Sequence, residues 1–130
     1  MWFEKYMILT RGFQNVREGG RVAGFQIKTR IVYYRGVFLP LVSRTDVTID
    51  GEKFPAESIR YKLGDRTFTQ EEAAKAYDVR WDFGVPLTVI VSKSGGLKPG
   101  PHDVEVYQVI STDYGGDRTG SAKKRITLVA

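Results

Sequence analysis

Residues 24–41 read GFQIKTRIVYYRGVFLPL, and this stretch decides the fold. Its first half alternates between two sets of side chains, with Phe25, Ile27, Thr29 and Ile31 on one face and Gln26, Lys28, Arg30 and Val32 on the other. A period of two is typical of a strand with one buried face. Tyr33 and Tyr34 break the alternation, and Arg35-Gly36 indicates a turn into a second apolar run, Val37-Phe38-Leu39. The stretch therefore predicts a half-buried strand in an antiparallel sheet.

The rest of the chain repeats this pattern in short segments joined by turns. Glu18-Gly19-Gly20-Arg21 predicts a hairpin turn after a strand at 13–16, and Asp50-Gly51 predicts a type I′ turn between alternating arms. Pro55 is expected to end the second of those arms, because it cannot donate to a ladder. Further strands are predicted at 5–9, 58–63, 79–83, 87–91, 103–110 and 126–129. About eight or nine short strands favour a single all-β domain over 1–130, an antiparallel β-sandwich with jelly-roll-like character.

Three segments depart from the strand pattern. Thr69 and Glu72 form a capping-box pair, which predicts a short helix over 70–76 that packs through Ala73, Ala76 and Tyr77. Residues 92–101 (SKSGGLKPGP) are rich in Gly and Pro and predict a loop. Residues 111–122 (STDYGGDRTGSA) are polar and rich in Gly, so we expect them to be the most flexible part of the chain.

Composition narrows the classes of partner and location. The 130 residues carry a net charge of +5, but the basic side chains are scattered apart from the run Lys123-Lys124-Arg125, which argues against nucleic acid. The chain has no cysteine, which excludes disulfides and thiolate metal sites. Charged residues interrupt the apolar N-terminal segment, and no run approaches the roughly 18 apolar residues of a membrane helix. We expect a cytoplasmic protein without a membrane partner.

Residues that could carry chemistry are sparse. His102 is the one histidine, and it precedes a strand as an expected exposed polar residue at a loop end. Asp103 follows it directly and is expected to point to the opposite face. Asp113 and Asp117 flank a Gly-Gly pair but lack the density of oxygen ligands that calcium requires. No glycine-rich phosphate loop or nucleophile elbow is present. We predict no catalytic, metal or cofactor site on this chain.

Aromatic residues give a better clue to function. Tyr33-Tyr34-Arg35 and Arg80-Trp81-Asp82-Phe83 place bulky side chains next to one another on strands, so one of each pair cannot face the same core. Tyr, Trp and Arg dominate protein–protein hot spots. The candidates for a partner interface are Tyr33, Tyr34, Arg35, Trp81 and Phe83. Two other interpretations stay open: both faces are buried in a two-layer fold, or the rings stack on a sugar in a stand-alone carbohydrate-binding module.

An ordered set of motifs resembles one known family. The set consists of FEKYM at 3–7, GFQNV at 12–16, GFQ at 24–26, IVYYRG at 31–36, DVRWDFG at 78–84, GGLKPGPHDV at 95–104 and KRITLV at 124–129. Together they are similar to the small β subunit of bacterial C-glycoside deglycosidases over nearly the whole chain. The segment 111–122 departs from that family's pattern, and because surface loops vary most and contact ligands, this departure leaves the partner's identity and the aglycone preference open.

The resemblance implies a non-catalytic β-sandwich subunit of a hetero-oligomer. For such a subunit we predict the 92–102 loop as a second contact beside the aromatic candidates. The implied partner is a larger α subunit, a TIM barrel similar to sugar isomerases and epimerases, which binds a divalent metal, usually manganese. The pair is expected to act as a lyase that cleaves the C–C bond between a 3-oxo-glucosyl group and a flavonoid or similar aromatic aglycone. Metal ligands and general base belong to the α subunit, so no catalytic residue is carried onto this chain.

Overall fold

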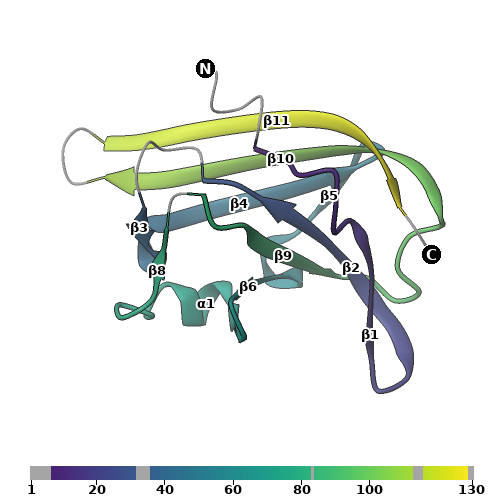
Figure 1. Ribbon diagram of the computed structural model, residues 1–130, viewed down its shortest axis with the longest axis horizontal. Coiled ribbons are helices and arrows are strands. Elements are labelled where there is room, and N and C mark those ends of the chain that lie inside the picture. Colours follow the sequence, from purple (N-terminus) through teal and green to yellow (C-terminus); the bar gives the residue numbers. More distant parts are fainter. Residues whose placement is uncertain (1–6, 32–35, 83, 113–115, 129–130) are drawn as a thin grey trace.

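The computed structural model describes residues 7–31, 36–82, 84–112 and 116–128. Within these ranges eleven strands form two larger sheets and one short ribbon (Figure 1). The first sheet has five strands in the order β1 (Gln14–Glu18), β2 (Arg21–Thr29), β9 (Leu87–Ser92), β6 (Ile59–Leu63) and β7 (Arg66–Thr69). The second sheet has four, in the order β11 (Gly116–Leu128), β10 (Gly100–Thr112), β4 (Val42–Ile49) and β5 (Glu52–Phe54).

Short elements connect and close these sheets. The ribbon pairs β3 (Val37–Phe38) with β8 (Arg80–Trp81). The helical pieces are two 3₁₀ turns, η2 (Leu39–Leu41) and η3 (Ala56–Ser58), and one α-helical turn, α1 (Gln70–Ala73). Every strand pairing is antiparallel. The prediction of an all-β antiparallel sandwich is confirmed.

The core lies between the two larger sheets. Phe25 on β2 meets Phe54 on β5 edge to face, with ring centroids 5.3 Å apart, so these rings join one sheet to the other. The Tyr61 hydroxyl on β6 donates to Thr45 Oγ1 on β4 at 2.8 Å, a second bond between the sheets. β9 is buried from Leu87 to Val91 and lies at the centre of the first sheet, between β2 and β6.

The two predicted hairpin turns form as their sequences require. Gly19 and Gly20 join β1 to β2, and Asp50-Gly51 joins β4 to β5. Asp50 has φ +50° and Gly51 has φ +87°, the pair of positive values that defines a type I′ turn. Asp is one of the few residue types other than Gly that tolerate this conformation. The Asp50 side chain is also held by a distant segment, with Oδ1 accepting from the Asp103 backbone N–H at 2.8 Å.

The prediction of a flexible segment at 111–122 is wrong over most of its length. β10 continues to Thr112 and β11 begins at Gly116, and the two run as paired thirteen-residue strands. Glycine and polar residues can occupy an edge strand such as β11 when it pairs with a long regular neighbour, because ladder bonds do not depend on side chains. The long pairing between β10 and β11 therefore outweighs local composition in deciding the structure of this segment.

Two smaller predictions also need correction. Met7, Ile8 and Leu9 are buried, but their strand-type pairing is a single isolated bridge from Ile8 to Thr29, so the described part of the predicted 5–9 strand is not a strand. The capping box at Thr69 and Glu72 is confirmed, yet α1 ends at Ala73. Ala73 and Ala76 are buried as predicted, whereas Tyr77 is 75% exposed and lies outside the core.

Candidate partner-binding surface

The β3–β8 ribbon closes one end of the sandwich. Val37 pairs with Trp81, and the Leu39 N–H donates to the Val79 carbonyl at 2.7 Å. Gly36 precedes the ribbon and lies close to the backbone of β8: a Cβ at Gly36 would lie 2.8 Å from the Trp81 carbonyl oxygen. The residue before β3 is therefore restricted to glycine, because the two backbones approach too closely for any side chain.

Trp81 lies inside the chain and has no exposed surface. Its indole Nε1–H donates to the Val85 carbonyl at 2.6 Å, which ties the turn after β8 to the ribbon. Trp81 therefore supports this end of the molecule from beneath. The other four interface candidates, Tyr33, Tyr34, Arg35 and Phe83, lie outside the described residues, and their role as contacts stays a prediction.

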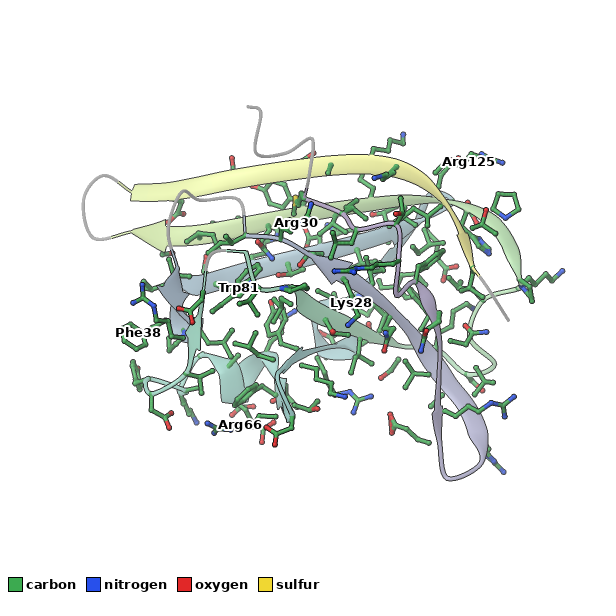
Figure 2. The ribbon with its side chains drawn as sticks, viewed as in Figure 1. Lys28, Arg30, Phe38, Arg66, Trp81 and Arg125 are labelled. Carbon is green, nitrogen blue, oxygen red and sulfur yellow. The ribbon has the colours of Figure 1, made fainter. Side chains whose placement is uncertain are left out.

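Beside this ribbon lie the large apolar side chains that the described part of the chain leaves exposed. Phe38 is 46% exposed, Tyr77 is 75% exposed and Val85 is 42% exposed. The Arg80 guanidinium carbon lies 5.7 Å from the centroid of the Phe38 ring, and Arg80 Nε donates to Asp82 Oδ1 at 2.8 Å. We call Phe38, Tyr77, Arg80 and Val85 the β3–β8 surface; Figure 2 shows Phe38 projecting at the margin and Trp81 within the molecule.

The β3–β8 surface has the composition of a protein interface. Aromatic residues and arginine are enriched at such contacts, and an arginine stacked on a ring presents both apolar area and fixed donors. The sequence predicted neither the exposure of Phe38 nor that of Tyr77. Strand alternation did hold the signal for Phe38, since buried Val37 and its neighbour must face opposite sides.

The second predicted contact, the loop at 92–102, lies at the other end of the sandwich (Figure 1). It is firmly held there. Asn15 on β1 exchanges two hydrogen bonds with the Leu97 backbone, both at 2.9 Å. The structure therefore does not bring the two predicted contact regions together on one face.

His102 anchors the end of that loop and is less exposed than the sequence suggested. Its side chain is 12% exposed. Nδ1 lies 2.6 Å from Asp50 Oδ2, and Nε2 lies 2.6 Å from the Lys98 carbonyl. Both partners are acceptors, so only the doubly protonated imidazolium satisfies both contacts. Burial lowers the pKa of His102, but the bonds to the Lys98 carbonyl and to Asp50 outweigh burial and raise it.

Asp50 is the matching anion of this pair. The hydrogen bond from His102, followed by the bond from the Asp103 N–H, lowers the pKa of the Asp50 carboxyl. Arg125 lies close by and bonds Asp103 Oδ1 at 3.0 Å. These groups hold the β4–β5 turn, the loop and the start of β10 together. We call His102, Asp50 and the Lys98 carbonyl the His102 clamp. Its role is structural rather than that of a catalytic dyad, since both nitrogens of the ring are already engaged.

Within the described ranges, no group of three or more His, Asp or Glu side chains comes together in a way that could hold a metal ion. The helices of those same ranges include none that is long and apolar enough to cross a membrane.

Comparison with known proteins identifies relatives of one kind. The family described as C-glycoside deglycosidase beta subunit matches residues 3–114. A C-glycoside deglycosidase beta subunit from Eubacterium cellulosolvens is 31% identical over 112 residues, which cover 85% of this chain and 76% of that protein. Another, from Arthrobacter globiformis, is 28% identical over 115 residues, covering 78% of this chain and 83% of that protein.

Proposed function

Because the chain belongs to the C-glycoside deglycosidase beta subunit family, we propose that it is the non-catalytic subunit of such an enzyme. It docks on a larger catalytic subunit through the β3–β8 surface. The name "beta subunit", carried by both relatives, supports the existence of a partner. We propose the residues of this surface as the site where that partner binds.

The single observation that carries the proposed surface is the exposure of Phe38 beneath Arg80. An exposed phenylalanine leaves apolar area in contact with water. Removing that area from water on binding stabilises a complex by about 25 cal/mol for each Å² covered. Tyr77 and Val85 extend the exposed apolar area on either side of β8. Trp81, buried underneath, keeps the backbone of this end in place for the partner.

The catalytic subunit in this proposal supplies a divalent metal, with manganese as the expected ion, and the general base. The complex cleaves the carbon–carbon bond between a 3-oxo-glucosyl group and an aromatic aglycone such as a flavonoid. This chain contributes by binding next to the active site and shaping its mouth. Its own residues take no part in proton transfer.

Co-expression of this chain with the catalytic subunit encoded in its source cells tests the proposal. The complex is expected to purify as a hetero-oligomer and to cleave a 3-oxo C-glucoside, while the isolated chain has no activity. Phe38→Ser with Tyr77→Ser should weaken assembly, since partner-facing aromatic side chains carry most of the energy of such contacts. Arg80→Ala should weaken it too, and Arg21→Ala, an exposed arginine on the β1–β2 hairpin at the other end, should not.

Two outcomes would overturn this assignment. Assembly unchanged in the Phe38, Tyr77 and Arg80 variants would show that the partner binds elsewhere. An isolated chain that stays monomeric beside the catalytic subunit and binds free sugars would instead support a stand-alone carbohydrate-binding module.

A further inference from the structure

A hollow of about 270 Å³ opens on the outer face of the first sheet. Its lining comes from three neighbouring strands and the turns beside them: Gln26, Lys28, Lys62, Gly64, Pro86 and Thr88. This volume lies just below the roughly 300–1,000 Å³ of typical small-molecule pockets, so the hollow suits a small ligand.

The sheet register sets the chemistry of this hollow. Lys28 on β2 pairs with Thr88 on β9, and Thr88 pairs with Lys62 on β6. The three side chains form one row across the sheet and share one face. The adjacent row, Ile27–Val89–Tyr61, is buried and points to the core, so the Lys28–Thr88–Lys62 row points outward.

Two lysines therefore flank one threonine in this row. Neighbouring strands lie about 4.7–4.9 Å apart, which places the two lysine backbones roughly 10 Å from each other. Lysine side chains are long enough to converge from that distance on a single ligand above Thr88. Like charges brought together in this way repel, and an anion between them relieves the repulsion.

The site is partly preorganised. Gln26 Nε2 donates to the Gly12 carbonyl at 3.0 Å, which fixes that amide at the edge of the hollow. Thr88 is 7% exposed and forms the floor. A fixed amide and a buried floor lower the entropy lost when a ligand binds. Lys28 is the part that moves: its stem lies against Gly12, on the β1 side of β2, and it rotates toward β9 to bring its ammonium group over Thr88.

No carboxylate lines the hollow, so its charge is not neutralised from within. The row beside it on the same face contains Arg60, which pairs with Ile90 across the sheet. Glu18 bonds this arginine through Arg60 Nη2 at 2.6 Å. That neighbouring carboxylate is thus engaged by its own cation rather than by either lysine of the hollow.

We propose that this hollow binds a small oxyanion, a phosphate or carboxylate group carried by a small molecule. Lys28 and Lys62 supply the charge, and the Thr88 hydroxyl supplies a hydrogen bond at the floor. The inference does not rest on the proposed subunit role, because none of these residues belongs to the β3–β8 surface. Its test on the isolated chain can succeed or fail independently of partner assembly.

Titration of the full chain with inorganic phosphate, followed by ¹⁵N NMR at constant ionic strength, tests the site. We expect saturable shifts centred on the amides of Thr88, Lys62 and Lys28. Lys28→Gln with Lys62→Gln should weaken binding about tenfold or more, since each removes a charge-assisted contact. Lys98→Gln with Lys123→Gln is the matched control: both residues are exposed and outside the hollow, and both double variants lower the net charge from +5 by two.

Equal weakening in the two double variants would overturn the proposal, because it would show a response to overall charge only. Shifts that never saturate, or that centre away from Thr88, would overturn it as well. A parallel titration with acetate identifies the source of the oxyanion: tighter binding of phosphate indicates a phosphate ester, and tighter binding of acetate indicates a carboxylic acid.

Discussion

At the scale of single residues, burial and hydrogen bonding assign roles that residue type alone did not. His102 was expected as an exposed polar residue, yet the structure clamps it between Asp50 and the Lys98 carbonyl. Trp81 was a candidate contact for a partner, yet it is wholly buried. For His102 the decisive neighbour is Asp50, in a turn distant in sequence. For Trp81 it is the Val85 carbonyl, in the turn that follows β8.

The His102 clamp predicts a stability that depends on pH. Its pKa is raised in the folded state, so the imidazolium stabilises the fold fully below the unfolded value near 6.5, and this stabilisation is lost as pH rises through the folded pKa. Asp50, whose pKa is lowered, stays ionised across this window. His102→Asn should therefore lower the melting temperature by a few degrees at pH 5.5 and by less at pH 8.5. A gap between parent and variant that is constant or widens with pH would contradict the clamp.

The Tyr61–Thr45 bond predicts a non-additive pair of substitutions. Burial raises the pKa of Tyr61 to about 12, so its phenol stays neutral and donates to Thr45 Oγ1 inside the core. Tyr61→Phe should cost about 0.5–1.5 kcal/mol in the free energy of unfolding, because the buried Thr45 hydroxyl loses its partner. Tyr61→Phe combined with Thr45→Val should cost less than the sum of the single changes. Urea denaturation measures all four proteins, and strict additivity would show that the bond is not formed.

At the scale of elements, backbone approach decides which residues a strand can accept. Gly24 on β2 lies between Val16 of β1 and Ser92 of β9, in the middle of the first sheet. A Cβ at this position would overlap the Val91 carbonyl oxygen. The alternation of residues 25–31 located the strand from sequence, but the need for glycine at its start comes from the neighbouring strand.

Gly24→Ala adds only one methyl group, yet we expect it to be strongly destabilising. The added methyl meets backbone atoms that cannot rotate away, so β2 and β9 must separate locally, at a cost of about 1–3 kcal/mol in unfolding free energy. Ser92→Ala, on the exposed partner residue, is the control and should stay within about 0.5 kcal/mol of the parent. Chemical denaturation of both variants gives the comparison. Equal stabilities would show that the strands do not approach as closely as described.

The capping box of α1 predicts a second effect at this scale. Thr69 Oγ1 accepts from the Glu72 N–H at 3.1 Å, and Glu72 Oε1 accepts from the Thr69 N–H at 2.8 Å. Thr69→Ala should cost about 0.5–2 kcal/mol, the usual price of a lost N-cap. Thr67→Ala, two residues earlier on β7 and exposed, serves as its control with little expected change. An unaffected Thr69 variant would mean that packing of Ala73 alone maintains this turn.

At the scale of the whole molecule, pairings between distant segments hold the sandwich together. β2 pairs with β9, and β10 pairs with both β4 and β11, so each large sheet combines strands from separate parts of the chain. The Phe25–Phe54 contact and the Tyr61–Thr45 bond then join the sheets. Because the strands are interleaved in this way, neither sheet can keep its core when the other unfolds.

The chain is therefore expected to unfold as one cooperative unit. Trp81 reports on the β3–β8 end through fluorescence, and Trp2→Phe removes the other indole of this two-tryptophan chain. In that variant the thermal transition of Trp81 fluorescence should coincide with the transition of far-UV circular dichroism, as two-state unfolding requires. Transitions that separate would show that the end carrying the β3–β8 surface unfolds before the two sheets do.

Sequence alone determined the features that depend on residues close together in the chain. Strand alternation in 24–31, the Asp50-Gly51 turn and the Thr69–Glu72 cap were all predictable, as was the family, because each is a local pattern with a physical or ordered-motif signature. Only the tertiary structure decided the length of the β10–β11 pair, the burial of Trp81 and the row of Lys28, Thr88 and Lys62. These features arise where strands from distant parts of the chain meet, and register between such strands is set by packing of the whole core.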